Sequence, residues 1–194
     1  MVLRQGFAGI ACVALVLSIT LGQVTYSETQ AGISTSEIET IAQKAEQGDV
    51  LYQTGLGAIY DDGIGIPQDY QQAYYWYRKA AIQGHARAQF LLGGMYADGR
   101  GISQDYQQAR HWYEKAANQG DTEAQYALSK VYALGKGVSI DYPTAYMWIN
   151  LAAAKNQAYI KIRDLIVKEI PSTEVEEGQR LTREWLAQHP NLNH

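Results

Sequence analysis

Residues 81–116 read AIQGHARAQFLLGGMYADGRGISQDYQQARHWYEKA, and the segments on both sides are imperfect copies of this stretch. Residues 45–80 match it at about 21 of 36 positions and residues 117–152 at about 16. The step is clearest in three tryptophans that are 36 residues apart: Trp76, Trp112 and Trp148. A fixed period of this length is typical of a repeat protein in which each unit stacks on its neighbours.

The first half of each unit predicts a helix. Ala88, Leu92 and Met95 are spaced four and three residues apart, so they share one helix face. Gly99 can adopt the left-handed backbone conformation that closes a helix, and Gly101 permits the sharp reversal that follows. We therefore expect a first helix that begins just after residue 84 and stops at this turn.

The second half of each unit predicts another helix. Asp105 is placed to cap its N-terminus, with Gln108 three positions later as a capping-box partner. The apolar face of this helix carries Ala109, Trp112, Tyr113 and Ala116. One helix pair of this size cannot bury its apolar face alone, so we expect neighbouring units to cover it and Trp112 to lie in the core between them.

The two ends of the array differ from the repeated units. Residues 36–47 match only the second half of a unit, with Ser36 and Glu39 as a capping box. Residues 153–188 begin like a first half and then diverge, which predicts a terminal repeat that ends in a capping helix over the last apolar face. The predicted repeat domain therefore spans residues 36–188.

The N-terminal residues 1–22 have the pattern of a secretory signal peptide. One early positive charge precedes an apolar core of roughly fifteen residues, which is short for a membrane span of about 20. Small and polar residues follow, so cleavage is expected between residues 22 and 27, with residues 23–35 as a flexible leader. The expected location is periplasmic or secreted. The alternative is an uncleaved inner-membrane anchor, and a membrane contact is expected only through this segment and only if it is uncleaved.

Composition excludes several classes of protein. With 16 Lys and Arg against 20 Asp and Glu, the chain has no basic excess for displacing phosphate counterions, which argues against nucleic-acid binding. Its single cysteine, Cys12, rules out both an intramolecular disulfide framework and a zinc site built from thiolates. This cysteine lies within the predicted signal peptide.

The repeated residues resemble the Sel-one-like repeat family, a relative of the tetratricopeptide repeats. The motif positions are Gly84, Ala88, Gln89, Leu92, Gly93, Tyr96, Gly99, Gly101, Asp105, Ala109, Trp112, Tyr113, Ala116 and Ala117. The third copy departs with Ser129 in place of Gly93 and Ile149 in place of Tyr113, which puts the local packing in question. The resemblance implies an all-α fold, a right-handed α/α superhelix whose concave face serves as a scaffold for proteins.

Residues that could carry chemistry have simpler structural explanations. Gly63-Ile64-Gly65 follows a helix rather than a strand and recurs in each unit, which favours a turn over a phosphate loop. His85 and His111 lack nearby ligand partners and are expected on the surface. Asp61-Asp62 is expected to be a solvated helix end rather than an acid–base pair. We therefore predict no catalytic residue, no bound metal and no cofactor.

Positions that vary among the copies are free to serve a partner. Tetratricopeptide-like arrays place their first helices on the concave side, so varying positions off the apolar face of these helices should line it. These positions are Leu51, Thr54, Ala58, Arg87, Phe90, Gly94, Glu123, Tyr126 and Lys130. Phe90 and Tyr126 occupy equivalent places and are expected to be partly exposed aromatic anchors, the residue type that often dominates interfaces.

The sequence predicts a non-enzymatic, exported module that binds a protein or peptide partner in its concave groove. A sharper form, suggested by the resemblance, is an envelope immunity or inhibitor protein that masks a toxin. The alternative is an enzyme, either a cell-wall-directed hydrolase or a penicillin-binding enzyme like the cysteine-rich branch of the family. No nucleophile, metal cluster or acid pair in the sequence favours this alternative.

Overall fold

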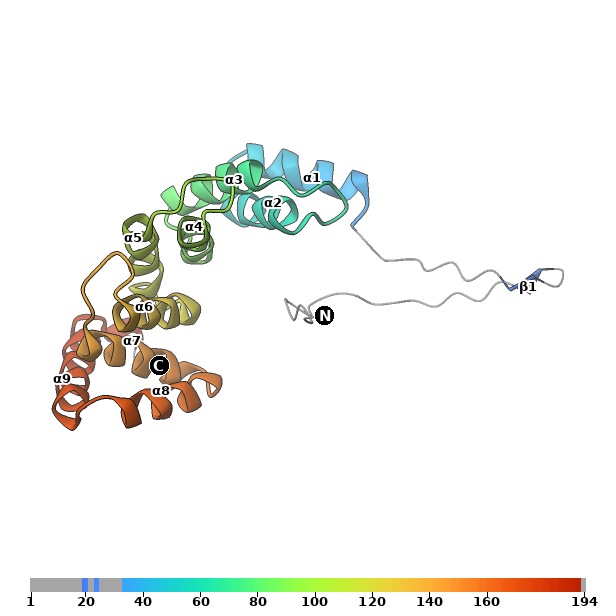
Figure 1. Ribbon diagram of the computed structural model, residues 1–194. Helices are drawn as coiled ribbons and strands as arrows, with labels where there is room; N and C mark the ends of the chain where they lie inside the picture. The colour runs from blue at the N-terminus through green and yellow to red at the C-terminus, as the bar shows by residue number, and fades with distance from the viewer. Residues whose placement is uncertain (1–18, 21–22, 25–32, 193–194) are drawn as a thin grey trace.

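The computed structural model describes residues 19–20, 23–24 and 33–192, whose helices form a curved stack (Figure 1). The elements are β1 (Ile19–Thr20), β2 (Gln23–Val24), α1 (Thr35–Glu46), α2 (Val50–Asp62), α3 (Tyr70–Ile82), α4 (Ala86–Asp98), α5 (Tyr106–Ala117), α6 (Thr122–Leu134), α7 (Tyr142–Lys155), α8 (Ala158–Glu169), α9 (Ser172–Gln188) and the short 3-10 helix η1 (Pro190–Leu192). β1 and β2 form a minimal antiparallel pair in which Ile19 is opposite Val24. The rest of the predicted signal peptide, residues 1–18 and 21–22, lies outside the described residues.

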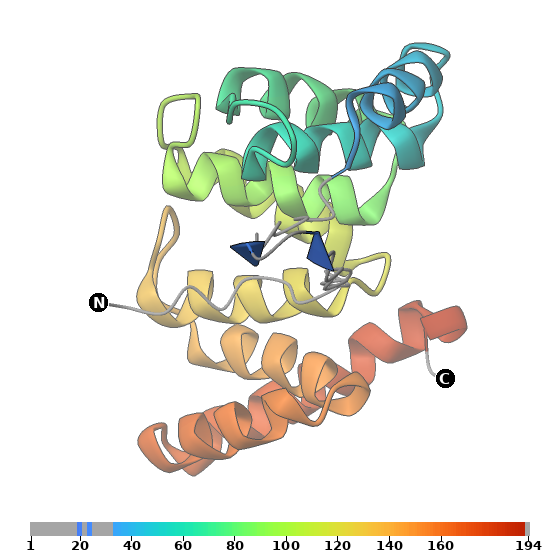
Figure 2. The same ribbon diagram turned by 90° about the vertical axis from the view of Figure 1, so that its right-hand side faces the viewer.

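The predicted all-α solenoid is confirmed. α1, α3 and α5 lie along the outer edge of the arc, and α2, α4 and α6 lie along its inner edge (Figure 1). Seen from the open side, the helices follow one another as a stack from α1 at the top to α8 at the bottom (Figure 2). Each inner helix packs on the outer helix that precedes it and on the one that follows it. The concave face is therefore made by the first helices of the repeats, as expected.

The turns have the predicted geometry. Gly99 and Gly101 both have φ of 70°, in the left-handed region where a side chain is strained. A Cβ at Gly101 would also lie 2.7 Å from the carbonyl oxygen of Tyr70, so the turn touches the preceding outer helix. Asp105 caps α5 by accepting hydrogen bonds from the backbone N–H groups of Gln107 and Gln108. The same four-part pattern of helix, glycine turn, aspartate cap and helix recurs along the arc.

A close contact between each inner helix and the next outer helix explains why the third copy departs from the motif. A Cβ at Gly93 would lie 2.7 Å from the ring of Tyr113, so only glycine leaves room for the ring at this position. The equivalent residues in the third copy are Ser129 and Ile149, both buried. Because Ile149 has no ring, the extra atoms of Ser129 fit. The two departures therefore offset each other.

α1 begins earlier than the sequence suggested. The expected capping box of Ser36 and Glu39 is replaced by one between Ser34 and Glu37, in which Glu37 N–H donates to Ser34 Oγ and Ser34 N–H donates to the Glu37 carboxylate. The sequence contains two overlapping Ser-x-x-Glu patterns two residues apart. The earlier one adds helical residues at the start, which leaves Ser36 inside the first turn.

The repeated tryptophans are not equally buried. Trp76 and Trp148 lie in the core, as predicted. Trp112 is only half-buried, so the expectation that it is a core residue is corrected. One side of its ring rests on the apolar cluster of α3 and α4, while the Lys115 ammonium lies 5.2 Å from the ring centroid at the surface.

The C-terminal region departs from the pattern of helix pairs. α8 contributes no buried residue, and α9 packs on α7 rather than on α8. In Figure 2, α9 runs obliquely to the stacked helices. Gly178 permits this close approach, since a Cβ there would lie 2.7 Å from the Tyr146 ring, and Trp185 packs edge-on against Trp148 at 5.8 Å between centroids. α9 is therefore the capping helix that the fold prediction required.

Candidate functional site

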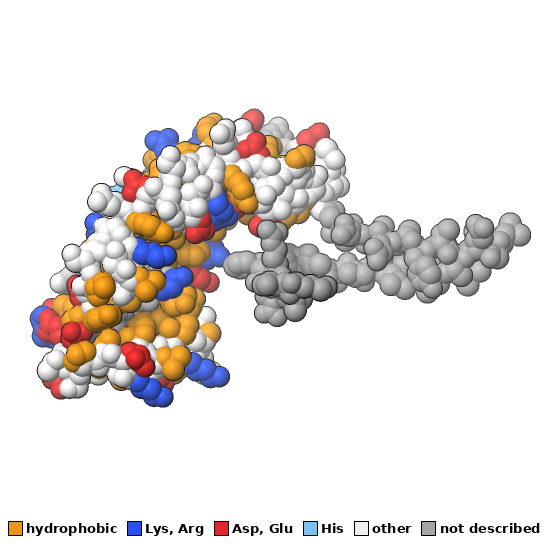
Figure 3. Space-filling model, in the orientation of Figure 1, with side chains coloured by type: hydrophobic (Ala, Val, Ile, Leu, Met, Phe, Trp, Pro, Cys, Tyr) orange, Lys and Arg blue, Asp and Glu red, His pale blue; other side chains and the backbone are white. Residues whose placement is uncertain are grey.

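A hollow of about 320 Å³ opens on the inner side of the arc, between α4, α6 and the start of α8. We call it the inner groove. Its lining residues are Phe90, Leu91, Gly94, Asp98, Arg100, Tyr113, Glu123, Tyr126, Ala127, Lys130 and Tyr159. Figure 3 shows apolar side chains gathered on the inner face of the C-terminal half of the arc, with Lys and Arg side chains at their border.

Aromatic rings from successive helices form the apolar part of the inner groove. The rings of Tyr126 on α6 and Tyr159 on α8 are 4.8 Å apart and tilted by 30°. Phe90 on α4 packs against Tyr113 with 5.8 Å between centroids. All four rings line the same hollow. Rings held by neighbouring helices lose little freedom when a ligand packs on them, which favours their use as anchors.

Charged side chains border the aromatic rings. The Arg87 guanidinium lies 4.9 Å from the centroid of Phe90 and 3.6 Å from the carboxylate of Glu123. The Lys130 ammonium lies 5.0 Å from the centroid of Tyr126. Each cation therefore faces the electron-rich face of a ring, an arrangement that holds both groups in place. The result is an apolar strip between charged edges that can form hydrogen bonds and ion pairs.

The side of the groove near α2 is fixed by an ion pair between repeats, which corrects the expectation for Asp61. Arg100 Nη1 donates to Asp61 Oδ1 at 2.5 Å, and Asp61 is buried rather than solvated. Burial and the nearby Asp61 carboxylate raise the pKa of the Tyr77 phenol, which donates to Asp61 at 3.4 Å. This network joins the first repeat to the turn of the second. Asp61 therefore holds Arg100 in place across the boundary between the two repeats.

The structure gathers most of the residues predicted for the concave site. Phe90, Glu123, Tyr126 and Lys130 all line the inner groove, and Arg87 reaches its edge through Glu123 and Phe90. This clustering tests only their placement. Their role in binding stays a prediction.

Two predicted residues of α2 do not join this cluster. Leu51 is 65% exposed but lies one repeat away from the residues that line the groove. Thr54 is buried, its hydroxyl donates to the Val50 carbonyl oxygen, and His85 Nδ1 lies 2.7 Å from Thr54 Oγ1. Thr54 is therefore not part of the exposed concave surface. His85 sits at the N-terminal end of α4 beside this hydroxyl, half-buried rather than on the open surface.

Sequence reasoning missed Tyr159 and Arg100. Tyr159 is one further step of 36 residues beyond Glu123, so extending the repeat into the diverged terminal unit would have found it. Arg100 lies in a turn, where its equivalents are Ile64 and Lys136, and the sequence carries no signal that it reaches back to α2. Its position depends on the contact between repeats, which only the folded arc provides.

The chemical groups of the groove favour binding. Burial raises the pKa of Tyr159, and the Glu123 carboxylate adds to this effect, so the phenol keeps its proton and remains a hydrogen-bond donor at neutral pH.

In the part of the chain that the structure describes, no three His, Cys, Asp or Glu side chains are grouped as metal ligands. The helices of that part are also too short or too polar to cross a membrane.

Comparison with known proteins supports the repeat assignment. The Sel1 repeat model matches residues 50–85, 86–121 and 122–157. A solved protective antigen of uropathogenic Escherichia coli strains, which displays an SLR fold, is 34% identical, with a TM-score of 0.74 over 80% of this chain and 34% of that chain. A Sel1 repeat protein from Oxalobacter formigenes is 35% identical, with a TM-score of 0.59 over 62% of this chain and 49% of that one. No curated protein matches. The chain spans about a third of the length of the first solved relative and about half of the length of the second.

Proposed function

The chain belongs to the Sel1 repeat family, and we propose that it is an exported interaction module that holds a protein or peptide segment in the inner groove. Sel1 repeat proteins are generally protein-interaction scaffolds and are typically non-catalytic. The binding surface, the partner and the export of this chain are our proposals.

One observation carries the proposal. The varying residues of α4, α6 and α8 converge on one hollow, although they come from three separate helices. Repeated residues are held constant by the packing that all copies share, so a cluster of varying aromatic and charged residues is free to fit a particular partner. Tyr126, Tyr159 and Phe90 would supply apolar contact, while Lys130 and Glu123 would fix the register of the bound segment.

Site-specific cross-linking tests the location. A photoreactive phenylalanine analogue replaces Tyr126 in one protein and Tyr75 in a matched control, since Tyr75 is 47% exposed on α3 of the outer edge. Both proteins are irradiated in the native host. We expect a discrete adduct from position 126 that excess unlabelled protein competes away, and no such adduct from position 75. Adducts from position 75 alone would place the partner on the outer edge and contradict the proposal.

Affinity for the cross-linked partner then tests the anchors. Tyr126→Ala should weaken binding by roughly 1–4 kcal/mol, or about ten-fold to nearly a thousand-fold. Its free energy of unfolding should change little, because the Tyr126 ring is only partly buried and packs on Tyr159 of α8, a helix with no buried residue. Phe90→Ala does not separate binding from folding. Phe90 packs on the core cluster formed by α5, α6, α7 and Trp185 of α9, so we expect this substitution to lower the free energy of unfolding as well as the affinity.

Export is tested separately. Residues 1–22 are proposed as a signal peptide, with cleavage between residues 22 and 27 and release into the periplasm or medium. The intact mass of the protein from that fraction should lack at least residues 1–21. Full-length protein in the membrane fraction would favour the uncleaved inner-membrane anchor instead. A secreted toxin whose activity the purified protein blocks would support the finer proposal, an immunity or inhibitor role in the envelope.

The enzymatic alternative, a cell-wall hydrolase or a penicillin-binding enzyme, is not favoured. The two carboxylates that line the inner groove, Glu123 and Asp98, each lie close to an arginine, at 3.6 Å from Arg87 and 3.5 Å from Arg100. Both carboxylates are therefore engaged in ion pairs with arginine, which gives them a structural role in the groove. Turnover of cell-wall material by the purified protein would reverse this preference.

A further inference from the structure

The first two repeats each bury one glutamine side chain and satisfy both ends of its amide. Gln53 Nε2 donates to the Ala45 carbonyl oxygen at 3.0 Å, and Gln53 Oε1 accepts from Gln83 Nε2 at 2.7 Å. The second repeat repeats this arrangement, with Gln119 Nε2 donating to Gln89 Oε1 at 2.8 Å. A buried amide needs both partners because water cannot replace a missing one.

The third repeat breaks this arrangement. Gln125 Nε2 still donates to the Ala117 carbonyl oxygen, at 3.3 Å, but the position of Gln83 and Gln119 is occupied by Lys155. Within the described part of the chain no donor reaches Gln125 Oε1, although the residue is only 1% exposed. A buried carbonyl oxygen without a hydrogen-bond donor is costly. The first two repeats supply a donor at this position, so its absence in the third repeat marks a place where a ligand could donate instead.

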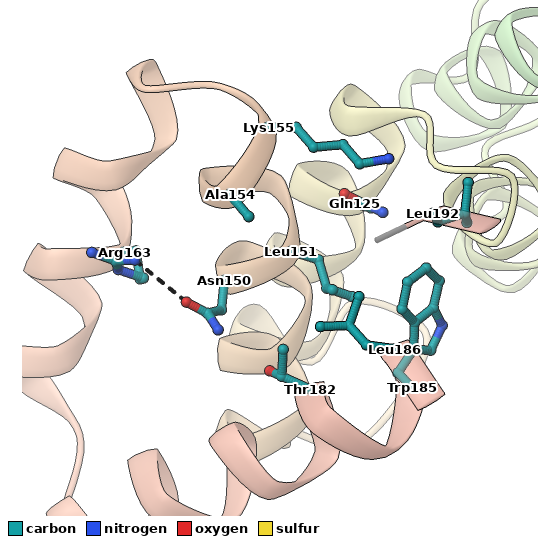
Figure 4. Close-up of a pocket in the computed structure, with 10 residues that line it drawn as sticks. All are labelled: Gln125, Asn150, Leu151, Ala154, Lys155, Arg163, Thr182, Trp185, Leu186 and Leu192. Carbon is teal, nitrogen blue, oxygen red and sulfur yellow. Dashed lines mark hydrogen bonds between the residues drawn. The ribbon is translucent and has the colours of Figure 1, made fainter. Parts of the chain in front are cut away.

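Gln125 is one of the lining residues of a pocket of about 240 Å³ formed by α6, α7, α8, α9 and η1 (Figure 4), and its unpartnered Oε1 is itself enclosed. Apolar contact comes from Leu151, Trp185, Leu186 and Leu192. In Figure 4, Gln125 lies between Lys155 and Leu192, while Arg163 and Asn150 lie beyond Leu151 on the other side. This pocket shares no lining residue with the inner groove, so it is a separate site.

The charges of the pocket specify an anion. Lys155 and Arg163 line it, and none of the described lining residues is acidic. Arg163 is partly engaged, because it donates to Asp164 at 2.8 Å and to Asn150 at 3.4 Å. The Lys155 ammonium forms no ion pair with the described residues, so it is the cation that is available to a ligand.

We propose that this pocket binds an apolar α-amino acid unit through its carboxylate and its N–H group. The Gln125 amide would rotate to present its enclosed Oε1 to the ligand N–H. The carboxylate would pair with Lys155, and the apolar side chain would pack between Leu151 and Trp185. The volume lies below the usual 300–1,000 Å³ of ligand pockets and suits one such unit. Two sources share this chemistry: the C-terminal residue of a peptide and a free amino acid.

The test uses the full chain and two probes, N-acetyl-L-leucine for a peptide end and L-leucine for a free amino acid. Binding is followed through the indole N–H resonance of Trp185, which lines the pocket. We expect one of the probes to shift this resonance with a Kd of about 1 mM or tighter, given the small number of ligand atoms. Binding of the acetylated probe alone identifies a peptide end, and binding of leucine alone identifies a free amino acid.

Three variants and one modified probe make the result decisive. Lys155→Gln recreates the donor found in the other repeats, so it should satisfy Gln125, remove the charge and weaken binding at least about ten-fold. Because residue 155 is exposed, this variant should fold. Lys155→Met removes only the charge and should also weaken binding. Lys161→Gln, an exposed lysine outside the pocket, should bind like the parent. The methyl ester of the bound probe should not bind.

Several results would overturn the proposal. These are no shift of the Trp185 resonance at about 10 mM of either probe, equal affinity in the parent and in Lys155→Gln, or undiminished binding of the methyl ester. A negative result for this pocket would not contradict the proposed function of the inner groove, because the two sites share no residue.

Discussion

The regular part of the molecule, α2 to α7, and its C-terminal part, α8 and α9, pack their helices in different ways. In the regular part every helix buries residues against its neighbours, and equivalent contacts recur. In the C-terminal part α8 buries none, and α9 packs on α7 instead. Both hollows described above include residues of α8. The comparison teaches that repetition holds the array together, and that both hollows include a helix at which the repetition stops.

The largest expected effect concerns the tryptophan at the border between the two parts. Trp148→Ala should lower the free energy of unfolding by about 3–5 kcal/mol, as large core truncations do, because this ring is buried and packs on Trp185 of α9. Trp112→Ala should cost only about 1–2 kcal/mol, since its ring is half-buried. Chemical denaturation of both variants decides the point. Equal losses would mean that Trp112 is as much a core residue as Trp148.

A second test exchanges the paired residues of the second and third repeats. Gly93→Ser should cost about 1–3 kcal/mol, because its side chain would collide with the Tyr113 ring. Ser129→Gly should cost only about 0.5–1 kcal/mol, since it removes atoms and adds backbone freedom.

Adding Tyr113→Ile to Gly93→Ser recreates the pair of the third repeat. The double variant should therefore be more stable than the sum of the two single changes implies, with a coupling of about 0.5–3 kcal/mol. Additive losses in this double-mutant cycle would show that the two departures in the third copy are unrelated.

Much of the fold could be predicted from these residues because local chemistry determines it. The 36-residue period, the left-handed Gly99 and the Asp105 cap all act over a few residues, and the structure confirms them. The arrangement of the C-terminal part could not be predicted in the same way. The packing of α9 on α7 depends on the contact between Gly178 and Tyr146, which does not recur with the 36-residue period. The clustering of Phe90, Glu123 and Tyr126 followed from counting repeats.

The remaining details depend on contacts between repeats. The burial of Thr54 follows from its contact with His85, 31 residues away. The ion pair between Arg100 and Asp61 spans 39 residues and has no equivalent in the next repeat, where the matching residues are Lys136 and Ala97. A periodic pattern reports what all copies share. It therefore carries no information about contacts that occur once.

The smallest expected effect concerns Asp121, which caps α6 at the edge of the regular part. Burial raises the pKa of this carboxyl above its ordinary value of 3.8, and Glu123 adds to the rise. The folded state therefore binds the proton more tightly than the unfolded chain, so the free energy of unfolding falls as the pH rises from 3.8 through the raised pKa.

Asp121→Asn keeps an oxygen that can accept from the Ala124 N–H and removes the titration. At pH 7 the variant should be as stable as the parent or more stable by less than about 1 kcal/mol. Its stability should also fall less over the acidic window. Denaturation curves collected across that window test the sign, and a steeper fall in the variant would refute it.

The central claim is that the inner groove between α4, α6 and α8 is the binding face. Hydrogen–deuterium exchange of the full chain, measured with and without the cross-linked partner, tests it most directly because it reports on every helix at once. We predict that the partner slows exchange in α4, α6 and the start of α8, and leaves α3 and α5 unchanged. Protection confined to α3 and α5, with α4, α6 and α8 unaffected, would contradict the claim.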